Sequence, residues 1–244
     1  MEIQVFDSYA SLSEKAADEV IQALQLRERP LFCVASGDTP KGLYRILAER
    51  CRRGQADISG WYFLGLDEWL GLGGDDPGSC RYMLEEDLIR PLGVQPGQCC
   101  FFDGRTKDPE AECSRVEAFI RQHGPIDLAV LGLGMNGHIG LNEPGTPASL
   151  RSHVSVIDPV TAQVGQKYFV RPQSLTQGIT LGMATLMEAA RLLLLINGEK
   201  KSAVLQQALE GEITPALPAS LLRRHPHYTV YTDAGAAGML HRAF

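Results

Sequence analysis

The chain has 244 residues and a mass of 26.7 kDa, with 23 lysines and arginines against 29 aspartates and glutamates, so its formal charge is −6. Hydrophobic residues make up 44 % and charged residues 21 %, which excludes a disordered chain and is typical of a globular one. No long basic run is present, and no segment reaches the ~18 apolar residues of a membrane span. We therefore expect neither a nucleic acid nor a membrane as partner.

The N-terminus and the cysteines indicate a reducing compartment. Residues 1–6 lack the basic and then apolar layout of a signal peptide, so we expect a cytoplasmic protein with reduced thiols. No Cys-x-x-Cys pair occurs, and the scattered spacing predicts no metal site. The cysteines are Cys33, Cys51, Cys80, Cys99, Cys100 and Cys113.

Short apolar runs alternate with amphipathic stretches along the chain. A capping box over Ser11 and Glu14 predicts the start of the first helix. The predicted helices are 11–24, 41–52, 79–90, 109–123, 181–190 and 200–210. The predicted strands are 1–6, 31–35, 61–66, 99–102, 126–131, 192–197 and 228–232.

This alternation predicts a single Rossmann-like α/β domain over residues 1–244, with an open, mostly parallel sheet and helices on both faces. In such sheets ligands bind beyond the carboxyl ends of the strands. The loops that leave the strands are therefore the candidate sites.

The first candidate loop is 35–42 (ASGDTPKG), between a strand and a helix. Small residues let backbone N–H groups approach an anion, and Ser36 and Thr39 add hydroxyl donors. Pro40 suits the first turn of a helix whose dipole favours a phosphate. The loop lacks the Gly-Lys-Ser/Thr ending of a nucleotide P-loop, and a plain helix start is the alternative interpretation.

The second loop begins with Asp67 and Glu68, directly after an apolar strand. Burial at such a place raises the pKa of a carboxylate toward the range of a general base. The alternative is a helix cap or a turn, which needs no chemistry.

The third loop is 132–145 (GLGMNGHIGLNEPG), after the apolar strand that ends at Leu131. Its glycines predict a tight loop with unusual backbone angles. Gly132, Gly134 and Gly137 form Gly-x-Gly-x-x-Gly, a weak dinucleotide signal because no long amphipathic helix follows. His138 and Glu143 resemble an orienting pair, in which a carboxylate fixes an imidazole. A satisfied core histidine is the alternative.

Together the three loops resemble the glucosamine-6-phosphate deaminase/isomerase family. The motifs are SGDTP at 36–40, LDEW at 66–69 and, above all, 132–145. The likeness extends through GITLG at 178–182 and INGEKK at 196–201. The segments PGSC at 77–80 and PALPAS at 215–220 are nearest the galactosamine-6-phosphate isomerase-like branch.

The resemblance implies a cofactor-free conversion of an amino-sugar 6-phosphate to a ketose 6-phosphate and ammonia, with glucosamine 6-phosphate and galactosamine 6-phosphate both open as substrates. Asp67 would move a proton between C2 and C1, and His138 would open the sugar ring with help from Glu143 and Asn136. The phosphate would be bound by Ser36, Gly37, Asp38, Thr39, Lys167 and Lys201. Members of the family occur as monomers and as larger assemblies, so a homo-oligomer is compatible with the resemblance.

Four residues depart from the family pattern. Asn136 stands where many members have Asp, Lys167 where Arg is common, and Cys80 where Tyr is frequent near the sugar. Asp38 replaces a Ser or Gly in the phosphate turn, and we expect its side chain to point away so that only its N–H serves. The C-terminal extension of allosteric relatives looks absent, which predicts hyperbolic kinetics.

Two other functions fit parts of this pattern. A 6-phosphogluconolactonase-type hydrolase would need His138 but not Asp67, and the Asn-Glu-Pro-Gly ending with Glu143 favours the amino-sugar enzymes. A non-catalytic sugar-phosphate-sensing module would need neither. Fewer than about 30 residues precede the first phosphate-loop strand, too few for a helix-turn-helix domain.

Overall fold

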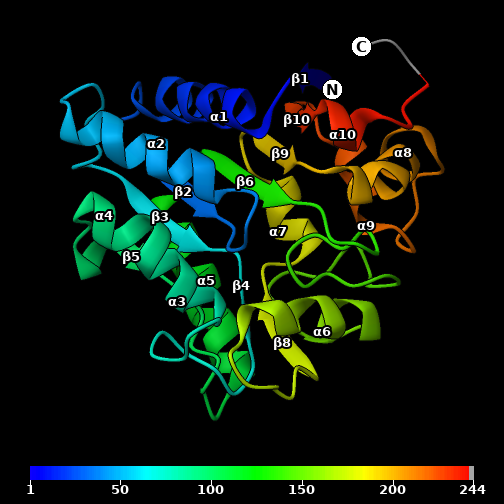
Figure 1. Cartoon of the computed structure of the whole chain (residues 1–244). Helices are drawn as coiled ribbons and strands as arrows, with labels where there is room; N and C mark the ends of the chain where they lie inside the picture. The colour runs from blue at the N-terminus through cyan, green and yellow to red at the C-terminus, as the bar shows by residue number, and fades with distance from the viewer. Residues whose placement is uncertain (242–244) are drawn as a thin grey trace.

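The computed structural model describes residues 1–241, whose strands form two sheets (Figure 1). The central sheet has seven strands in the order β1-β10-β9-β6-β2-β3-β5, and every pairing in it is parallel. This confirms the predicted α/β fold with a mostly parallel sheet. The strands are β1 (Glu2–Phe6), β2 (Leu31–Val34), β3 (Tyr62–Gly65), β5 (Cys99–Cys100), β6 (Leu128–Gly132), β9 (Leu192–Ile196) and β10 (Tyr228–Asp233).

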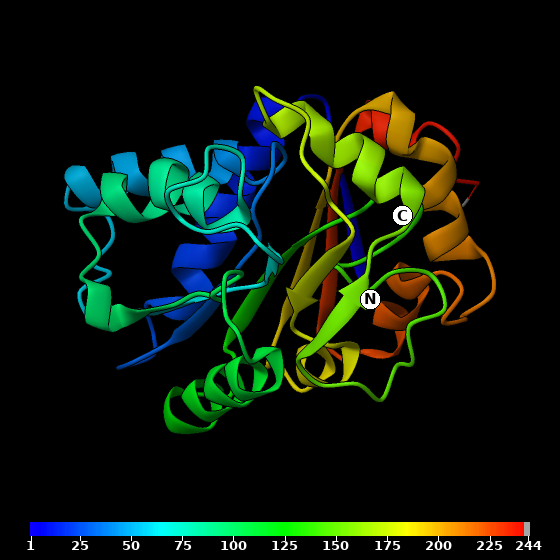
Figure 2. The same cartoon turned by 90° about the horizontal axis from the view of Figure 1, so that it is seen from below.

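Helices cover both faces of this sheet, as Figure 2 shows. The α-helices are α1 (Tyr9–Leu24), α2 (Lys41–Arg52), α3 (Cys80–Leu84), α4 (Arg90–Leu92), α5 (Pro109–His123), α6 (Pro159–Gly165), α7 (Met183–Met187), α8 (Ser202–Glu210), α9 (Pro218–Leu221) and α10 (Ala234–Ala237). The π-helix η1 is Glu85–Ile89, and the 3₁₀ turns are η2 (Pro96–Gln98), η3 (Gln166–Tyr168), η4 (Glu199–Lys201) and η5 (Leu222–Arg224). Within residues 1–241, no helix has both the length and the apolarity to cross a membrane.

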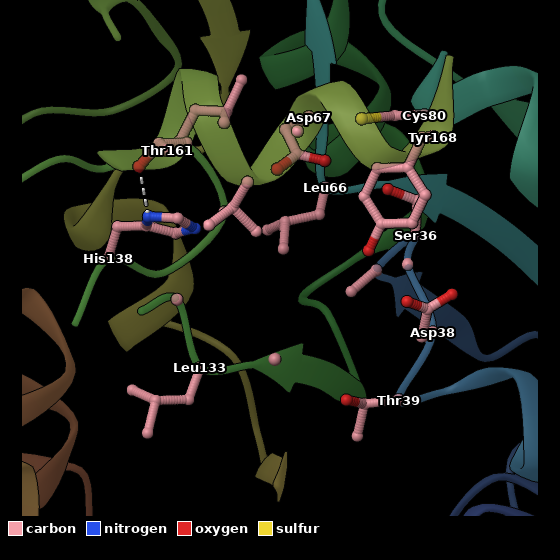
Figure 3. Close-up of a pocket in the computed structure, with 18 of the residues that line it drawn as sticks. Ser36, Asp38, Thr39, Leu66, Asp67, Cys80, Leu133, His138, Thr161 and Tyr168 are labelled. Carbon is pink, nitrogen blue, oxygen red and sulfur yellow. Dashed lines mark hydrogen bonds between the residues drawn. The ribbon is translucent and has the colours of Figure 1, made fainter. Parts of the chain in front are cut away.

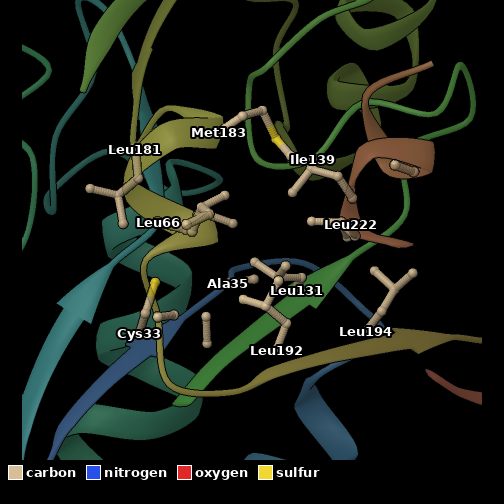
Figure 4. Close-up of a cluster of buried hydrophobic side chains, with 14 of the residues drawn as sticks. Cys33, Ala35, Leu66, Leu131, Ile139, Leu181, Met183, Leu192, Leu194 and Leu222 are labelled. Atoms are coloured by element: carbon tan, nitrogen blue, oxygen red, sulfur yellow. The ribbon is translucent and has the colours of Figure 1, made fainter. Parts of the chain in front are cut away.

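The central strands are buried on both faces, because alternate side chains point to opposite sides of a strand. In β6, Leu128 and Val130 pack against α1 and α2, whereas Ala129 and Leu131 belong to the core beneath α5, α7 and α8. Figure 4 shows the second of these cores, where Leu131 lies beside residues of β2 and β9. Such uninterrupted apolar runs explain why these strands are easy to predict from the sequence.

The chain order of the strands reverses between β2 and β6. From β2 the chain adds β3 and then β5 on one side, and from β6 it adds β9 and then β10 on the other. The loops that leave β2 and β6 consequently diverge, and the crevice between them is where open α/β sheets bind ligands. They are residues 35–42, hereafter called the anion turn after its predicted role, and residues 132–145, the glycine-rich loop.

The structure contains a second, smaller sheet that the sequence did not predict. Its strands are β4 (Asp67–Trp69), β8 (Gln177–Thr180) and β7 (His153–Val156), paired antiparallel in the order β4-β8-β7. The sequence indicated a loop at Asp67, but Asp67 pairs with Thr180 instead. Each of these strands has only three or four residues, some of them polar or glycine, so the sequence shows no alternation of apolar and polar residues that would predict a strand. Only the pairing in the tertiary structure defines them.

Several predicted boundaries change for identifiable reasons. The helices 41–52 and 109–123 are confirmed at both ends. The first helix begins earlier than expected, at Tyr9, because Ser8 forms the capping box with Ser11. The predicted helix 79–90 is a succession of α3, η1 and α4. The predicted helix 181–190 shortens to α7, since Leu181 follows directly on β8.

Asn142 ties the glycine-rich loop to the second sheet. It is fully buried, and its Nδ2 donates to the carbonyl of Ile139 at 2.8 Å and to that of Leu181 at 2.9 Å. Leu181 continues from β8, whose last residue pairs with Asp67. The loop after β6 is thus held against the strand that carries Asp67.

We predict that Asn142→Ala lowers the free energy of unfolding by about 1–3 kcal/mol, because two buried hydrogen bonds are lost. Urea denaturation measures this change. The matched control, Gln22→Ala on the exposed side of α1, should stay within about 0.5 kcal/mol. Equal effects of the two substitutions would contradict the tethering role of Asn142.

Candidate active site

A cavity of about 190 Å³ opens at the carboxyl ends of β2, β3 and β6, beneath α6 and η3 (Figure 3). Most of the sequence-predicted site residues line it, although they come from segments far apart in the chain. These are Ser36, Gly37, Asp38, Thr39, Asp67, His138, Lys167 and Lys201. Cys80, Thr161 and Tyr168 also line the cavity, and the sequence had assigned no role to Thr161 or Tyr168.

The turn after β2 is shaped by one glycine and one tyrosine. Gly37 has φ +103°, a conformation that residues with a Cβ rarely adopt. The hydroxyl of Tyr9 donates to the carbonyls of Asp38 and Thr39 and accepts from the N–H of Gly42 at 2.8 Å. The N-cap residue of α2, Pro40, gives no side-chain cap, so apart from the N–H of Gly42, which Tyr9 takes, the positive end of the helix dipole is left for an anion.

Two lysines stand at this end of the cavity. Lys167 lies 2.8 Å from the carboxylate of Asp38, which is also 3.8 Å from Lys41. Lys201 donates to the carbonyl of Leu133, and its burial, with the charge of Lys167 nearby, lowers its pKa to about 8. This end of the cavity therefore carries positive charge, but one of the two lysines is already paired with a carboxylate.

Asp38 is engaged through both its side chain and its backbone. Its carboxylate contacts Lys167, and its N–H, which we expect to serve a phosphate, donates to the hydroxyl of Tyr168. The same hydroxyl lies 3.2 Å from where a Cβ on Gly37 would be. Lys167 and Tyr168 of η3 thus cover the anion turn in this structure.

The two adjacent acids have different surroundings. Glu68 is fully buried, and its carboxylate accepts from the N–H groups of Trp69, Cys80 and Arg81 at 2.8–3.0 Å. Burial raises the pKa of Glu68 to about 7, against the opposing effect of these three bonds. Glu68 therefore joins β4 to the start of α3, the capping role that the sequence had left open.

Asp67 faces the cavity and is otherwise surrounded by protein (Figure 3). Burial raises the pKa of Asp67 to about 6, and the thiol of Cys80 and the charge of His138 offset part of this effect. The Cys80 thiol has a pKa well above its usual value, chiefly because of burial, so it stays protonated and donates to Asp67. A carboxylate with few partners and a pKa near neutrality can take up and release a proton.

The imidazole of His138 packs on Gly134 at the other end of the cavity. A Cβ on Gly134 would lie 2.4 Å from the ring, so only glycine permits this position. The Nδ1 atom of His138 lies 2.8 Å from Oδ1 of Asn136 and 3.6 Å from the carboxylate of Glu143. This close approach of ring and backbone explains why a glycine precedes His138 at position 134 of the motif.

Asn136 and Glu143 lie behind His138 rather than in the cavity wall. The Nδ2 of Asn136 donates to Oε2 of Glu143 at 2.9 Å. Burial would raise the pKa of Glu143, but contacts with His138, Asn136 and Thr161 outweigh it and hold the pKa below its usual value. Glu143 is therefore an ionised carboxylate beside a histidine, as an orienting pair requires.

No group of three or more His, Cys, Asp or Glu side chains in the described part of the chain is arranged to hold a metal ion. Cys80 touches Asp67 and Ser36 rather than another cysteine. The cavity brings together the carboxylate of Asp67, the imidazole of His138 and the turn at residues 36–39. Together, the fold and the cavity define an α/β protein with a carboxylate, an imidazole and two lysines around a cavity at the strand ends.

Comparison with known proteins assigns the chain to a protein family. Residues 6–231 match the family described as glucosamine-6-phosphate isomerases/6-phosphogluconolactonase, and the chain belongs to that family. A glucosamine-6-phosphate deaminase from Halothermothrix orenii is 34 % identical over 241 residues, 98 % of this chain and 100 % of that protein. The putative deaminase AgaI of Escherichia coli is 37 % identical over 227 residues, 93 % of this chain and 89 % of that protein.

A solved structure agrees with these matches. The chain superposes on a monomeric glucosamine-6-phosphate deaminase, described as a missing link of the NagB superfamily, with a TM-score of 0.94 at 33 % sequence identity. The alignment covers 98 % of this chain and 100 % of that one. The family resemblance indicated by the loop motifs is confirmed.

We predict that Asp67→Asn stabilises the protein in a pH-dependent way. The pKa of Asp67, about 6, exceeds the value of about 3.9 in an unfolded chain, so the carboxyl group ionises at lower pH in the unfolded chain than in the folded protein. The free energy of unfolding therefore falls as the pH rises from about 4 to about 6. The neutral amide should raise the free energy of unfolding by about 1–3 kcal/mol at pH 8 and by much less at pH 4. Urea unfolding at both pH values tests this, and an equal gain at both would contradict it.

Proposed function

We propose that the protein converts an amino-sugar 6-phosphate, glucosamine 6-phosphate or galactosamine 6-phosphate, into a ketose 6-phosphate and ammonia without a cofactor. One observation carries the proposal: Asp67 and His138 face a single cavity whose other wall is the anion turn. Two separate proton-transfer groups at a fixed position from a phosphate site suit an aldose–ketose isomerisation. The names of the relatives agree with this assignment.

The phosphate would bind at the turn of Ser36, Gly37, Asp38 and Thr39, against the N-terminus of α2. Lys201 and Lys167 would supply charge, with Lys167 exchanging Asp38 for the phosphate. Because the phosphate is remote from C1 and C2, its binding energy positions the reacting carbons rather than activating them.

His138 would open the pyranose ring. It takes the proton of the C1 hydroxyl and returns it to the ring oxygen, so the C1–O5 bond breaks and an aldehyde forms. Glu143 and Asn136, behind the ring, hold the imidazole during this transfer.

Asp67 would then carry out the isomerisation. As a carboxylate it removes the proton from C2 while the aldehyde oxygen O1 takes up a proton, giving an enolamine. It then returns the proton to C1 while the amino nitrogen gives one up, so that the proton count balances and an imine forms at C2. Water adds to that imine and ammonia leaves, which yields the ketose phosphate. A pKa of about 6 supports this role, because the group both accepts and donates a proton near neutral pH.

Incubation with hexosamine 6-phosphates should release ammonia and ketose phosphate in equal amounts. We expect Asp67→Asn to lower kcat by about 10²–10⁴-fold while a hexitol 6-phosphate still binds. In the unmodified protein kcat/KM should fall below about pH 6, as Asp67 becomes protonated. Rapid hydrolysis of 6-phosphogluconolactone without hexosamine turnover would establish the lactonase alternative, and binding without turnover of either would establish the sensing module.

A second prediction concerns Asp38. Asp38→Asn removes a carboxylate beside the expected phosphate and frees Lys167, so KM should fall about 3–10-fold at low salt and less at high salt. Steady-state kinetics over a salt series measure this. Asp87→Asn is the control, because Asp87 pairs with Lys41 at 3.6 Å without lining the cavity, and its KM should not change. A higher KM for Asp38→Asn would contradict the prediction.

A further inference from the structure

Thr161 lies between the histidine and the acidic residue behind it. Its Oγ1 is 2.8 Å from Nδ1 of His138, as the dashed line in Figure 3 shows, and it donates to Oε2 of Glu143 at 3.1 Å. The side chain comes from α6, and the residue is only 5 % exposed. Because His138 and Glu143 themselves are 3.6 Å apart, the hydroxyl of Thr161 forms the shorter connection between them.

The surrounding bonds determine where the protons are. Nδ2 of Asn136 faces the carboxylate of Glu143 at 2.9 Å, so Oδ1 of Asn136 is the atom 2.8 Å from Nδ1 of His138. That oxygen also accepts from the backbone N–H of His138, which fixes the amide orientation. A carbonyl oxygen can only accept, so this contact favours the tautomer in which Nδ1 carries the proton.

The hydroxyl of Thr161 then has one consistent arrangement. It shares the Nδ1–H of His138 with Oδ1 of Asn136, accepts from Nδ2 of Asn136 at 3.3 Å, and gives its own proton to the carboxylate of Glu143. The other ring nitrogen, Nε2, is left with a lone pair that points into the cavity (Figure 3). The charge of Glu143 thus reaches the imidazole through two neutral groups, the Thr161 hydroxyl and the Asn136 amide.

We propose that Thr161 is a positioning residue: it is the second acceptor that, with Asn136, holds His138 in the Nδ1–H tautomer, so that Nε2 is the atom that accepts and returns the proton in ring opening. This rests on the proposed function. The transfer moves one proton from the C1 hydroxyl to Nε2 and then to the ring oxygen, with no net change at the protein. While Nε2 holds the proton the imidazole is a cation, and the chain through Thr161 to Glu143 stabilises it.

Two substitutions separate the hydroxyl from the shape of the side chain. Thr161→Val keeps the volume and removes the hydroxyl, and we expect kcat to fall about 10–100-fold with KM within about threefold. Thr161→Ser restores the hydroxyl and should retain kcat within about threefold. Val160→Thr, on an exposed position of the same helix, is the matched control and should behave like the unmodified protein.

The tautomer is measured without substrate by ¹⁵N NMR of the histidine-labelled full chain, with the His138 signals assigned by their loss in His138→Gln. The unmodified protein and Thr161→Ser should show Nδ1 protonated, and Thr161→Val should show a mixture with the Nε2–H form. A fall in kcat with the His138 signals unchanged would make Thr161 a support of α6 and overturn the proposal, as would full activity of Thr161→Val. If no hexosamine phosphate is turned over, the proposed function fails, and the NMR comparison alone still decides whether Thr161 holds His138.

Discussion

The arrangement of the cavity depends on how each buried carboxylate is compensated for its removal from water. A carboxylate without partners in a protein interior is strongly disfavoured in its charged form. Glu68 is compensated by three backbone N–H groups, and Glu143 by the Thr161 hydroxyl and the Asn136 amide. Asp67 has the weak thiol donor of Cys80, and His138 favours its charged form only when the imidazole is protonated. The acid with the fewest partners is therefore the one that faces the cavity with a pKa near neutrality.

These three carboxylates also link the parts of the structure. Glu68 joins the second sheet to α3, and so brings Cys80 beside Asp67. Glu143 joins the glycine-rich loop to α6 through Thr161. The same segment continues into η3, where Lys167 and Tyr168 reach the anion turn. The acid–base end and the anion end of the cavity are consequently connected by one short stretch of chain.

The sequence predicted the central sheet well and the second sheet not at all. Runs such as Leu192–Ile196 are apolar on both faces, and few structures other than a buried strand accommodate them. The strand at Asp67 has three residues and follows another strand after one residue, so no period distinguishes it from a turn. Thr161 and Tyr168 were missed for a related reason: a threonine and a tyrosine in a short helical segment have no motif, and only their contacts reveal them.

By itself, the sequence determined the fold class, the family and the residues expected to carry the chemistry. These depend on local patterns, namely apolar strands and glycine-rich loops that directly follow them. The tertiary structure decided which carboxylate faces the cavity, which one caps a helix, and through which hydroxyl Glu143 reaches His138. Such roles depend on desolvation and on hydrogen bonds between segments more than ten residues apart, and no spacing within a single segment encodes them.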